Sequence, residues 1–271
     1  MKKIGFIDYY LSEWHANNYP AWIREANEAL GTDYEVAYGW GELDLSPKYG
    51  ETSAQWCEKM GVELCGSIEE VCEKSDVLLI LAPSDPDRHL AYAKKVLPYG
   101  KPTYIDKTFA PNLAEAKEIF ALAEEYHTPF FSTSALRYAD ELSDITNVSN
   151  LIVTGGGGNL PEYLVHQVEM AVLLLGDAAK SAKVERQGAQ YIARVETEGG
   201  KSVTFVYAPK MPFSVTVEDA NGTPAYRAIQ SDFFRGLIAD ILKFYESGKP
   251  SFDTKQTLEV MRMRDMILSR I

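Results

Sequence analysis

The hydrophobic pattern changes its period part of the way along the chain. In the first part, short apolar runs such as Val77-Leu-Leu-Ile-Leu81 alternate with amphipathic stretches of helical period. Continuously apolar strands interleaved with helices are typical of a parallel sheet covered on both faces. The pattern therefore predicts a doubly wound, Rossmann-like α/β unit. Its predicted strands are residues 3–9, 34–38, 76–81, 103–105 and 129–132, and its predicted helices are residues 16–30, 52–60, 67–73, 86–97 and 113–126.

The second part has the pattern of an antiparallel sheet. After Gly155, runs such as Val203-Thr-Phe-Val-Tyr207 alternate between the two faces and are rich in β-branched residues, which indicates strands with one buried face. Turn signals at Glu198-Gly-Gly and at Asn221-Gly separate such runs. We therefore expect an α+β unit with a mainly antiparallel sheet. Its predicted strands are residues 182–187, 191–196, 202–207 and 214–218, and its predicted helices are residues 161–175, 232–246 and 254–271.

Length and composition favour two domains. The chain has 271 residues, of which 46% are hydrophobic, and this is enough for more than one packed unit. We expect a Rossmann-like domain at residues 1–127 and an α+β domain at residues 128–271, with the final helices able to pack back on the first domain. Gly248 and Pro250 separate those two helices, because glycine suits a C-terminal cap and proline blocks continuation.

The charge of the chain excludes some classes of partner. A formal net charge of −12 argues against nucleic acid and anionic membrane surfaces, because both require a basic patch. A small molecule is the expected ligand. No apolar run approaches the roughly eighteen residues that span a bilayer, and the chain starts directly with a strand rather than a signal-peptide core, so we expect a cytoplasmic protein. Cys57, Cys65 and Cys72 lack CxxC spacing and are expected to be reduced, packed thiols.

A lysine stands where this kind of fold places its ligands. Asp106 and Lys107 follow the predicted strand 103–105 and precede a helical run that starts at Asn112. Both residues therefore lie at the C-terminal edge of the sheet, where open α/β sheets bind ligands. A partly desolvated lysine at this edge can move a proton to or from a substrate. The alternative is a surface lysine that simply pairs with Asp106.

Three segments together resemble one family of enzymes. They are Gly100-Lys-Pro-Thr-Tyr-Ile-Asp-Lys107, the stretch from Gly157-Gly through Glu162 to His166, and Ala82-Pro83 leading to His89. With the order of the two predicted sheets, they resemble the Gfo/Idh/MocA family of NAD(P)-dependent sugar and polyol oxidoreductases. Asp106 stands where the family has Glu, and Glu162 stands where it has Asp.

The resemblance implies a role for each candidate residue. Lys107 would bridge cofactor and substrate and move the hydroxyl proton, and Asp106 would tune it. His166 would share in proton transfer, with Glu162 orienting it or holding a substrate hydroxyl, because Glu162, His166 and Glu169 share one helix face. The alternative for His166 is a helix histidine satisfied by its neighbours. The implied cofactor is NAD or NADP, placed near Ala82, Pro83, His89 and Lys107; His89 could equally be a capping or surface residue.

The glycine-rich loop of the family is missing. In the stretch 7–15, Asp8 and Tyr10 occupy the first two glycine positions of GxGxxG. Those glycines let the backbone approach a pyrophosphate at a helix N-terminus, whereas an aspartate adds negative charge and a tyrosine adds bulk there. Asp8, Tyr9 and Tyr10 are the residues expected at the cofactor position, and the tyrosines, with Trp14, could fill it or stack on a sugar or base. Glu42 is the candidate for the acidic residue that contacts a ribose.

The leading hypothesis from the sequence is an enzyme, and there is one alternative. Lys107, Glu162 and His166 favour an oxidoreductase that transfers hydride between a nicotinamide and a hydroxyl-bearing carbon of a sugar-like or polyol substrate. The altered loop favours a non-catalytic or cofactor-independent member that serves as a sugar-binding, regulatory or subunit protein. Glu162 and His166 could also share a metal, but spacing suggests no third ligand, so we expect none. The resemblance further implies a homo-oligomer through the C-terminal sheet and a hinge at the four glycines 155–158.

Overall fold

The computed structural model describes residues 1–219 and 222–271, and it divides into two compact units. The first unit comprises residues 1–132 and 238–254, and the second comprises residues 133–237 and 255–271. The domain boundary expected between residues 127 and 128 stays a prediction. The turn predicted at Asn221-Gly falls partly outside the described residues, because Asn221 is not among them.

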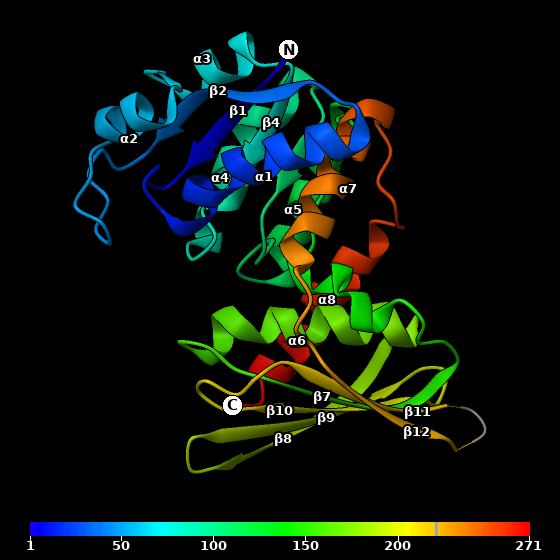
Figure 1. Ribbon diagram of the computed structural model, residues 1–271. Coiled ribbons are helices and arrows are strands. Elements are labelled where there is room, and N and C mark those ends of the chain that lie inside the picture. Colours follow the sequence, from blue (N-terminus) through cyan, green and yellow to red (C-terminus); the bar gives the residue numbers. More distant parts are fainter. Residues whose placement is uncertain (220–221) are drawn as a thin grey trace. The chain divides into compact units, whose positions relative to one another are not determined.

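The first unit contains a six-stranded, fully parallel sheet, which confirms the predicted Rossmann-like architecture (Figure 1). The strand order is β3-β2-β1-β4-β5-β6. Its strands are β1 (Lys2–Asp8), β2 (Tyr34–Gly41), β3 (Glu63–Leu64), β4 (Val77–Ile80), β5 (Thr103–Ile105) and β6 (Phe130–Phe131). Helices α1 (Trp14–Leu30), α2 (Ser53–Met60), α3 (Ile68–Lys74), α4 (His89–Val96) and α5 (Leu113–Glu125) connect them, with short 3-10 turns η1 (Pro86–Arg88) and η2 (Leu97–Tyr99).

Side-chain caps fix where these helices begin. Thr52 and Gln55 form a reciprocal capping box at the start of α2, and the Ser67 side chain accepts the Glu70 amide at the start of α3. Asn112 accepts the amide of Glu115 at 2.9 Å, so α5 begins at Leu113. This cap ends the loop that carries Asp106 and Lys107, and thereby limits that loop to the C-terminal edge of β5.

A late segment of the chain completes the core of the first unit. Helix α7 (Phe233–Ser247) passes from the second unit into the first. Its Phe244 ring lies 5.0 Å from the ring of Phe131, and the Tyr245 hydroxyl donates to the Leu78 carbonyl at 2.7 Å. Cys57, Cys65 and Cys72 are buried, as expected, and burial raises the pKa of the Cys57 and Cys72 thiols to about 12.

The second unit contains a mixed, mostly antiparallel sheet, as predicted. The order is β12-β11-β7-β10-β9-β8, and only the β7–β10 pairing is parallel among the described strand pairs of this sheet. The strands are β7 (Val148–Gly155), β8 (Ala179–Gln187), β9 (Gln190–Thr197), β10 (Ser202–Tyr207), β11 (Ser214–Asp219) and β12 (Pro224–Ala228). Strands β7 and β12 were not expected from the sequence. Two 3-10 turns, η3 (Ala135–Tyr138) and η4 (Asp140–Leu142), precede β7.

Two helices cover one face of this sheet. Helix α6 (Leu160–Leu175) and helix α8 (Lys255–Leu268) pack against each other and against the sheet. Val153 and Phe205 are buried beneath them at 1% exposure or less. Ile152, which points to the opposite face of β7, is 44% exposed, because successive strand residues alternate between faces. The sheet thus has one covered face and one open face.

Other groups of the protein pack closely against the glycine run 155–158. A Cβ atom at Gly156 would lie 1.8 Å from the Ala208 carbonyl oxygen, and one at Gly157 would lie 2.0 Å from the Tyr163 ring. A Cβ at Gly155 would meet the Phe213 ring at 2.3 Å. Three of the four glycines are therefore required because other groups approach the backbone closely. The hinge expected at this position stays a prediction.

Candidate functional site

Lys107 lies just after β5 and is almost buried. Its residue exposure is 9%, and its Nζ donates to the Pro83 carbonyl at 3.1 Å. The pairing with Asp106 that the sequence allowed is not made, and among residues 1–219 and 222–271 the ammonium has no carboxylate within 4.0 Å. Pro83 follows β4, so the ends of two neighbouring strands hold this lysine. Its partial desolvation is what a proton-transferring lysine requires.

Asp106 is turned toward helix α1 instead of toward Lys107. It is 1% exposed, and its Oδ1 accepts hydrogen bonds from the hydroxyls of Tyr104 at 3.2 Å and Tyr19 at 3.4 Å. Its Oδ2 lies 3.8 Å from Nε2 of His15. The role of Asp106 in tuning Lys107 stays a prediction, and the contacts indicate that its first partners are aromatic groups of the first unit.

A second buried acid, Asp8, is the last residue of β1. Asp8 is 1% exposed, and its Oδ1 accepts the backbone amides of Tyr9 at 2.7 Å and Ala82 at 2.9 Å. Its Oδ2 has no hydrogen-bond partner among the described residues. Burial raises the pKa of Asp8 well above its usual range, and the negative charges of Glu13 and Asp106 raise it further. Asp8 therefore holds its proton to unusually high pH.

A third carboxylate caps the helix that follows. Glu13 is the N-cap of α1 and is 4% exposed. Its Oε1 accepts the backbone amide of Ala16, and its Oε2 lies 3.1 Å from Nδ1 of His15. The sequence pattern did not single out Glu13. Its position directly before the helix was the available signal, but glutamate is not among the residues that usually cap a helix N-terminus.

The tyrosines of this loop are held by groups of the first unit. The Arg88 guanidinium lies 4.7 Å from the Tyr9 ring centroid, and its Nη1 pairs with Glu42 at 3.1 Å. The other Glu42 oxygen accepts the Tyr92 hydroxyl at 2.7 Å. Burial raises the pKa of Tyr10 to about 12, and the charges of nearby acids, Asp85 first, add to this. Glu42, the candidate for contacting a ribose, is thus already engaged by protein groups.

The β1–α1 loop does not fit a dinucleotide in the pose that a glycine-rich loop provides. Counted from Asp8, the three glycine positions of GxGxxG fall on Asp8, Tyr10 and Glu13. In that pose, amides at the start of the helix hold the pyrophosphate. Here the Glu13 carboxylate takes an amide of α1, and the Asp8 carboxylate takes those of Tyr9 and Ala82. Carboxyl groups of the chain itself thus occupy the place where the pyrophosphate would lie.

The motif of Ala82 and Pro83 leading to His89 follows directly after β4. Ala82 has a positive φ of 50° and donates its amide to Asp8, while Pro83 accepts from Lys107. His89 is fully buried, with Nε2 2.6 Å from the Leu81 carbonyl and Nδ1 3.0 Å from the Phe109 carbonyl. Burial lowers the pKa of His89. Its cofactor-binding role stays a prediction, and its contacts join the ends of β4 and β5.

The remaining two candidates lie in the second unit, on α6. Nδ1 of His166 lies 2.7 Å from the Ser134 hydroxyl, which also accepts the Leu136 amide at 3.2 Å. If the Ser134 hydroxyl donates to Nδ1, the proton of a neutral His166 is on Nε2. Ser134 was not expected from the sequence, because the contact joins α6 to a turn about thirty residues earlier.

The two glutamates that share a face with His166 have different surroundings. Glu162 accepts the side-chain amide of Asn159 at 2.9 Å. Glu169 is 3% exposed and forms a 2.6 Å ion pair with Arg137. A buried pair of this kind makes Glu169 a structural residue, because breaking it would leave an uncompensated charge. Of the predicted site residues, Asp8, Ala82, Pro83, His89, Asp106 and Lys107 lie together at the strand ends of the first unit, and Glu162 and His166 lie on α6 of the second.

The described residues contain neither a metal-binding cluster nor a membrane-spanning helix. Within residues 1–219 and 222–271, no group of three or more His, Cys, Asp or Glu side chains is arranged to hold a metal ion. In the same part of the chain, no helix combines the length and the apolar character needed to cross a bilayer.

The parallel sheet with its strand-end lysine, followed by a mixed sheet, defines a Rossmann-like protein with a second, α+β unit. The model of the Gfo/Idh/MocA family, described as "Oxidoreductase family, NAD-binding Rossmann fold", matches residues 45–134. The match spans 90 of the 271 residues and includes Asp106 and Lys107. It is also similar to the uncharacterized oxidoreductase YhhX of Escherichia coli (strain K12), with 40% identity over 63 residues; that match covers 23% of this chain and only 18% of the relative.

Solved structures share the fold along the whole chain. A myo-inositol dehydrogenase from Lactobacillus casei, in complex with NAD(H) and myo-inositol, has a TM-score of 0.79 at 12% identity, covering 100% of this chain and 94% of that one. A UDP-N-acetylglucosamine 3-dehydrogenase from Acidithiobacillus ferrooxidans has a TM-score of 0.77 at 13% identity, covering 99% and 97%. At such low identity, these likenesses establish the fold.

Proposed function

We propose that this chain is a sugar- or polyol-binding member of the family that does not bind a dinucleotide in the family's usual pose. One observation carries the proposal: Asp8, Tyr10 and Glu13 stand at the three glycine positions. Glu13 bonds an amide in the first turn of α1, where a pyrophosphate would be held, and Asp8 bonds the amides of Tyr9 and Ala82 beside it. A pyrophosphate would have to displace these groups and lie beside buried acids.

The chemistry around this loop suits a polyhydroxylated ligand. Trp14, the first residue of α1, is 38% exposed, and Tyr9 and Tyr10 precede it by five and four residues, so aromatic rings are present in and just after the β1–α1 loop. Carboxylates and a lysine ammonium complement hydroxyl groups, which both donate and accept hydrogen bonds. The sugar and inositol dehydrogenases that share the fold support the same class of ligand.

A second candidate function is oxidation or reduction at a hydroxyl-bearing carbon of such a ligand, with a nicotinamide as hydride carrier. The retained, nearly buried Lys107 favours it, as does the Ser134–His166 contact, which orients an imidazole. In that case Lys107 and His166 would handle the hydroxyl proton, Glu162 would orient His166 or hold a hydroxyl, and Asp106 would tune Lys107.

Titration of the purified chain separates the two candidates. NADH and NADPH are added up to about 1 mM, which corresponds to a binding free energy near −4 kcal/mol, while nicotinamide fluorescence and thermal stability are followed. A panel of polyols, with myo-inositol and common hexoses, is titrated in parallel and monitored by tryptophan fluorescence and thermal shift. We expect no saturable dinucleotide binding and at least one polyol that saturates.

Two results would count against the proposal. Saturable binding of either dinucleotide would show that the loop admits the cofactor and would make the dehydrogenase the better candidate. Failure of every polyol to shift fluorescence or stability would remove the proposed ligand class, whatever the outcome with NADH and NADPH.

A further inference from the structure

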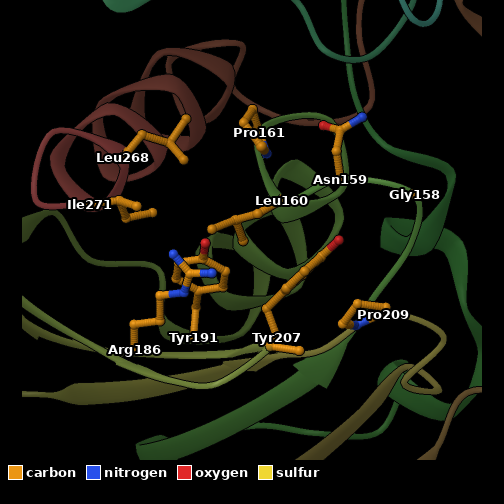
Figure 2. A pocket seen from close by; sticks show the side chains of 11 residues that line it. Gly158, Asn159, Leu160, Pro161, Arg186, Tyr191, Tyr207, Pro209, Leu268 and Ile271 are labelled. Carbon is orange, nitrogen blue, oxygen red and sulfur yellow. The ribbon is translucent and has the colours of Figure 1, made fainter.

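The second unit contains a cavity that none of the predicted site residues lines. Its volume is about 600 Å³, within the range of roughly 300–1,000 Å³ in which small-molecule sites fall. It lies where the start of α6, the end of α8 and the β8–β9 end of the sheet converge (Figure 2). Lys107, Glu162 and His166 are not among its lining residues.

Most of the cavity wall is apolar or aromatic. Leu160 and Leu268 come from the two helices, and Tyr191 and Tyr207 come from the sheet (Figure 2). The two tyrosine rings lie 6.3 Å apart. The Tyr207 hydroxyl is fixed by a 3.1 Å hydrogen bond to the Gly157 carbonyl. Such a wall accommodates the hydrophobic body of a ligand and fixes the two aromatic faces against which it would pack.

One cation at the edge of the cavity is oriented but not neutralised. The Arg186 guanidinium lies 5.4 Å from the Tyr191 ring centroid, and its Nε donates to the Gly188 carbonyl at 3.0 Å. Arg186 faces Tyr191 across the β8–β9 pair. In the described parts of the chain no carboxylate lies within ion-pair distance of it, although the chain carries a net charge of −12. Stacking and one hydrogen bond thus restrain the guanidinium, and both Nη groups remain for a ligand.

We propose that this cavity binds a small organic anion with an apolar body, whose carboxylate or phosphate pairs with Arg186. The planar guanidinium matches either group in a bidentate arrangement. The ligand would also touch Asn159 and Pro161 at the start of α6. Because Asn159 caps α6 and donates to Glu162, occupancy acts on the first turn of the helix that carries Glu162 and His166.

Two fluorescent probes that differ in charge test the assignment. 1-Anilinonaphthalene-8-sulfonate carries an anionic group on an aromatic body, and N-phenyl-1-naphthylamine is the same body without the sulfonate. On the intact chain, we expect saturable binding of the anionic probe at one site per chain and about tenfold weaker binding of the neutral probe. Hydrocinnamate and phenyl phosphate should displace the anionic probe, and the better competitor identifies the preferred head group; 3-phenylpropanol should not displace it.

Substitutions at the cavity edge test whether Arg186 binds the anionic group of the probe. Arg186→Gln should weaken binding of the anionic probe about tenfold and leave the affinity for the neutral probe unchanged. Arg186 is exposed in a hairpin, so this change leaves the core intact. Lys183→Gln removes one positive charge from an exposed position of the same strand. It should leave the affinity for both probes unchanged. The proposal would be overturned if Arg186→Gln bound the anionic probe as tightly as the unmodified chain does. It would also be overturned if Lys183→Gln lost as much affinity for that probe as Arg186→Gln, or if the anionic probe did not saturate.

Discussion

A single aspartate at the end of β1 should control part of the pH dependence of stability. The pKa of Asp8 is raised in the folded state by burial and by neighbouring acids. The stability that this group contributes is complete below its unfolded pKa of about 3.9 and is lost as pH rises through the higher folded pKa. Asp8→Asn keeps the Oδ1 acceptor for Tyr9 and Ala82 but has no charge to bury. We expect the variant to be more stable than the unmodified chain at pH 8, with the gain vanishing toward pH 4, in urea unfolding at several pH values.

The exposed Asp44 provides the matched control. Asp44→Asn removes a carboxylate from the surface and should show no pH-dependent difference from the unmodified chain. A constant difference between Asp8→Asn and the unmodified chain from pH 4 to pH 8 would mean that Asp8 is ionised in the folded protein.

At the level of elements, the β1–α1 loop should exclude dinucleotides through its three substituted glycine positions. We expect the triple change Asp8→Gly, Tyr10→Gly and Glu13→Gly to raise NADH affinity at least about tenfold, because it frees the amides of α1 and the end of β4. Glycine is tolerated as an N-cap, and circular dichroism reports whether α1 and the sheet persist. Fluorescence titration with NADH is the measurement.

A change at Tyr9, which lies between two of the motif's glycine positions, controls for a general increase in the flexibility of this loop. Tyr9→Gly alters the same segment without restoring GxGxxG, and it should leave NADH affinity as it was. If the triple variant is folded and still fails to bind NADH, the loop is not what excludes the cofactor.

These elements also show what the sequence could predict. The strand β4 was evident because its apolar run is continuous, as a strand buried on both faces requires. Strand β7 was missed because Ser149 and Asn150 interrupt its apolar pattern and because its partners, β10 and β11, lie about fifty to seventy residues later. For the site, Asp8 and Tyr10 could be found from motif spacing. The capping by Glu13 and the contact between Ser134 and His166 depend on tertiary geometry, which local pattern does not encode.

At the level of the whole molecule, the open face of the second sheet is where we expect self-association. Ile152 and Tyr226 are 44% and 62% exposed, and both pair with Thr216 on the intervening strand, so the three side chains lie in one row on this face. Ile152→Glu with Tyr226→Glu should convert an oligomer to a monomer in size-exclusion chromatography with light scattering, because buried charges oppose association.

Tyr126, which is 40% exposed in the first unit, is the control position. Tyr126→Glu should leave the assembly unchanged. A monomeric unmodified chain at tens of micromolar would remove this face as an oligomer contact, and an equal effect of Tyr126→Glu would show that added charge alone is responsible.

The split of the first unit along the chain has a consequence for how the protein is made. Its sheet is complete by Phe131, but Phe244 and Tyr245, which pack on Phe131 and bond to Leu78, lie beyond the entire intervening segment 133–237. At translation rates of about 5–20 residues per second, roughly 5–20 seconds separate the emergence of the sheet from that of its last core helix. During that interval the nascent chain exposes the apolar surface against which α7 later packs. This is the surface that a ribosome-associated chaperone would need to shield.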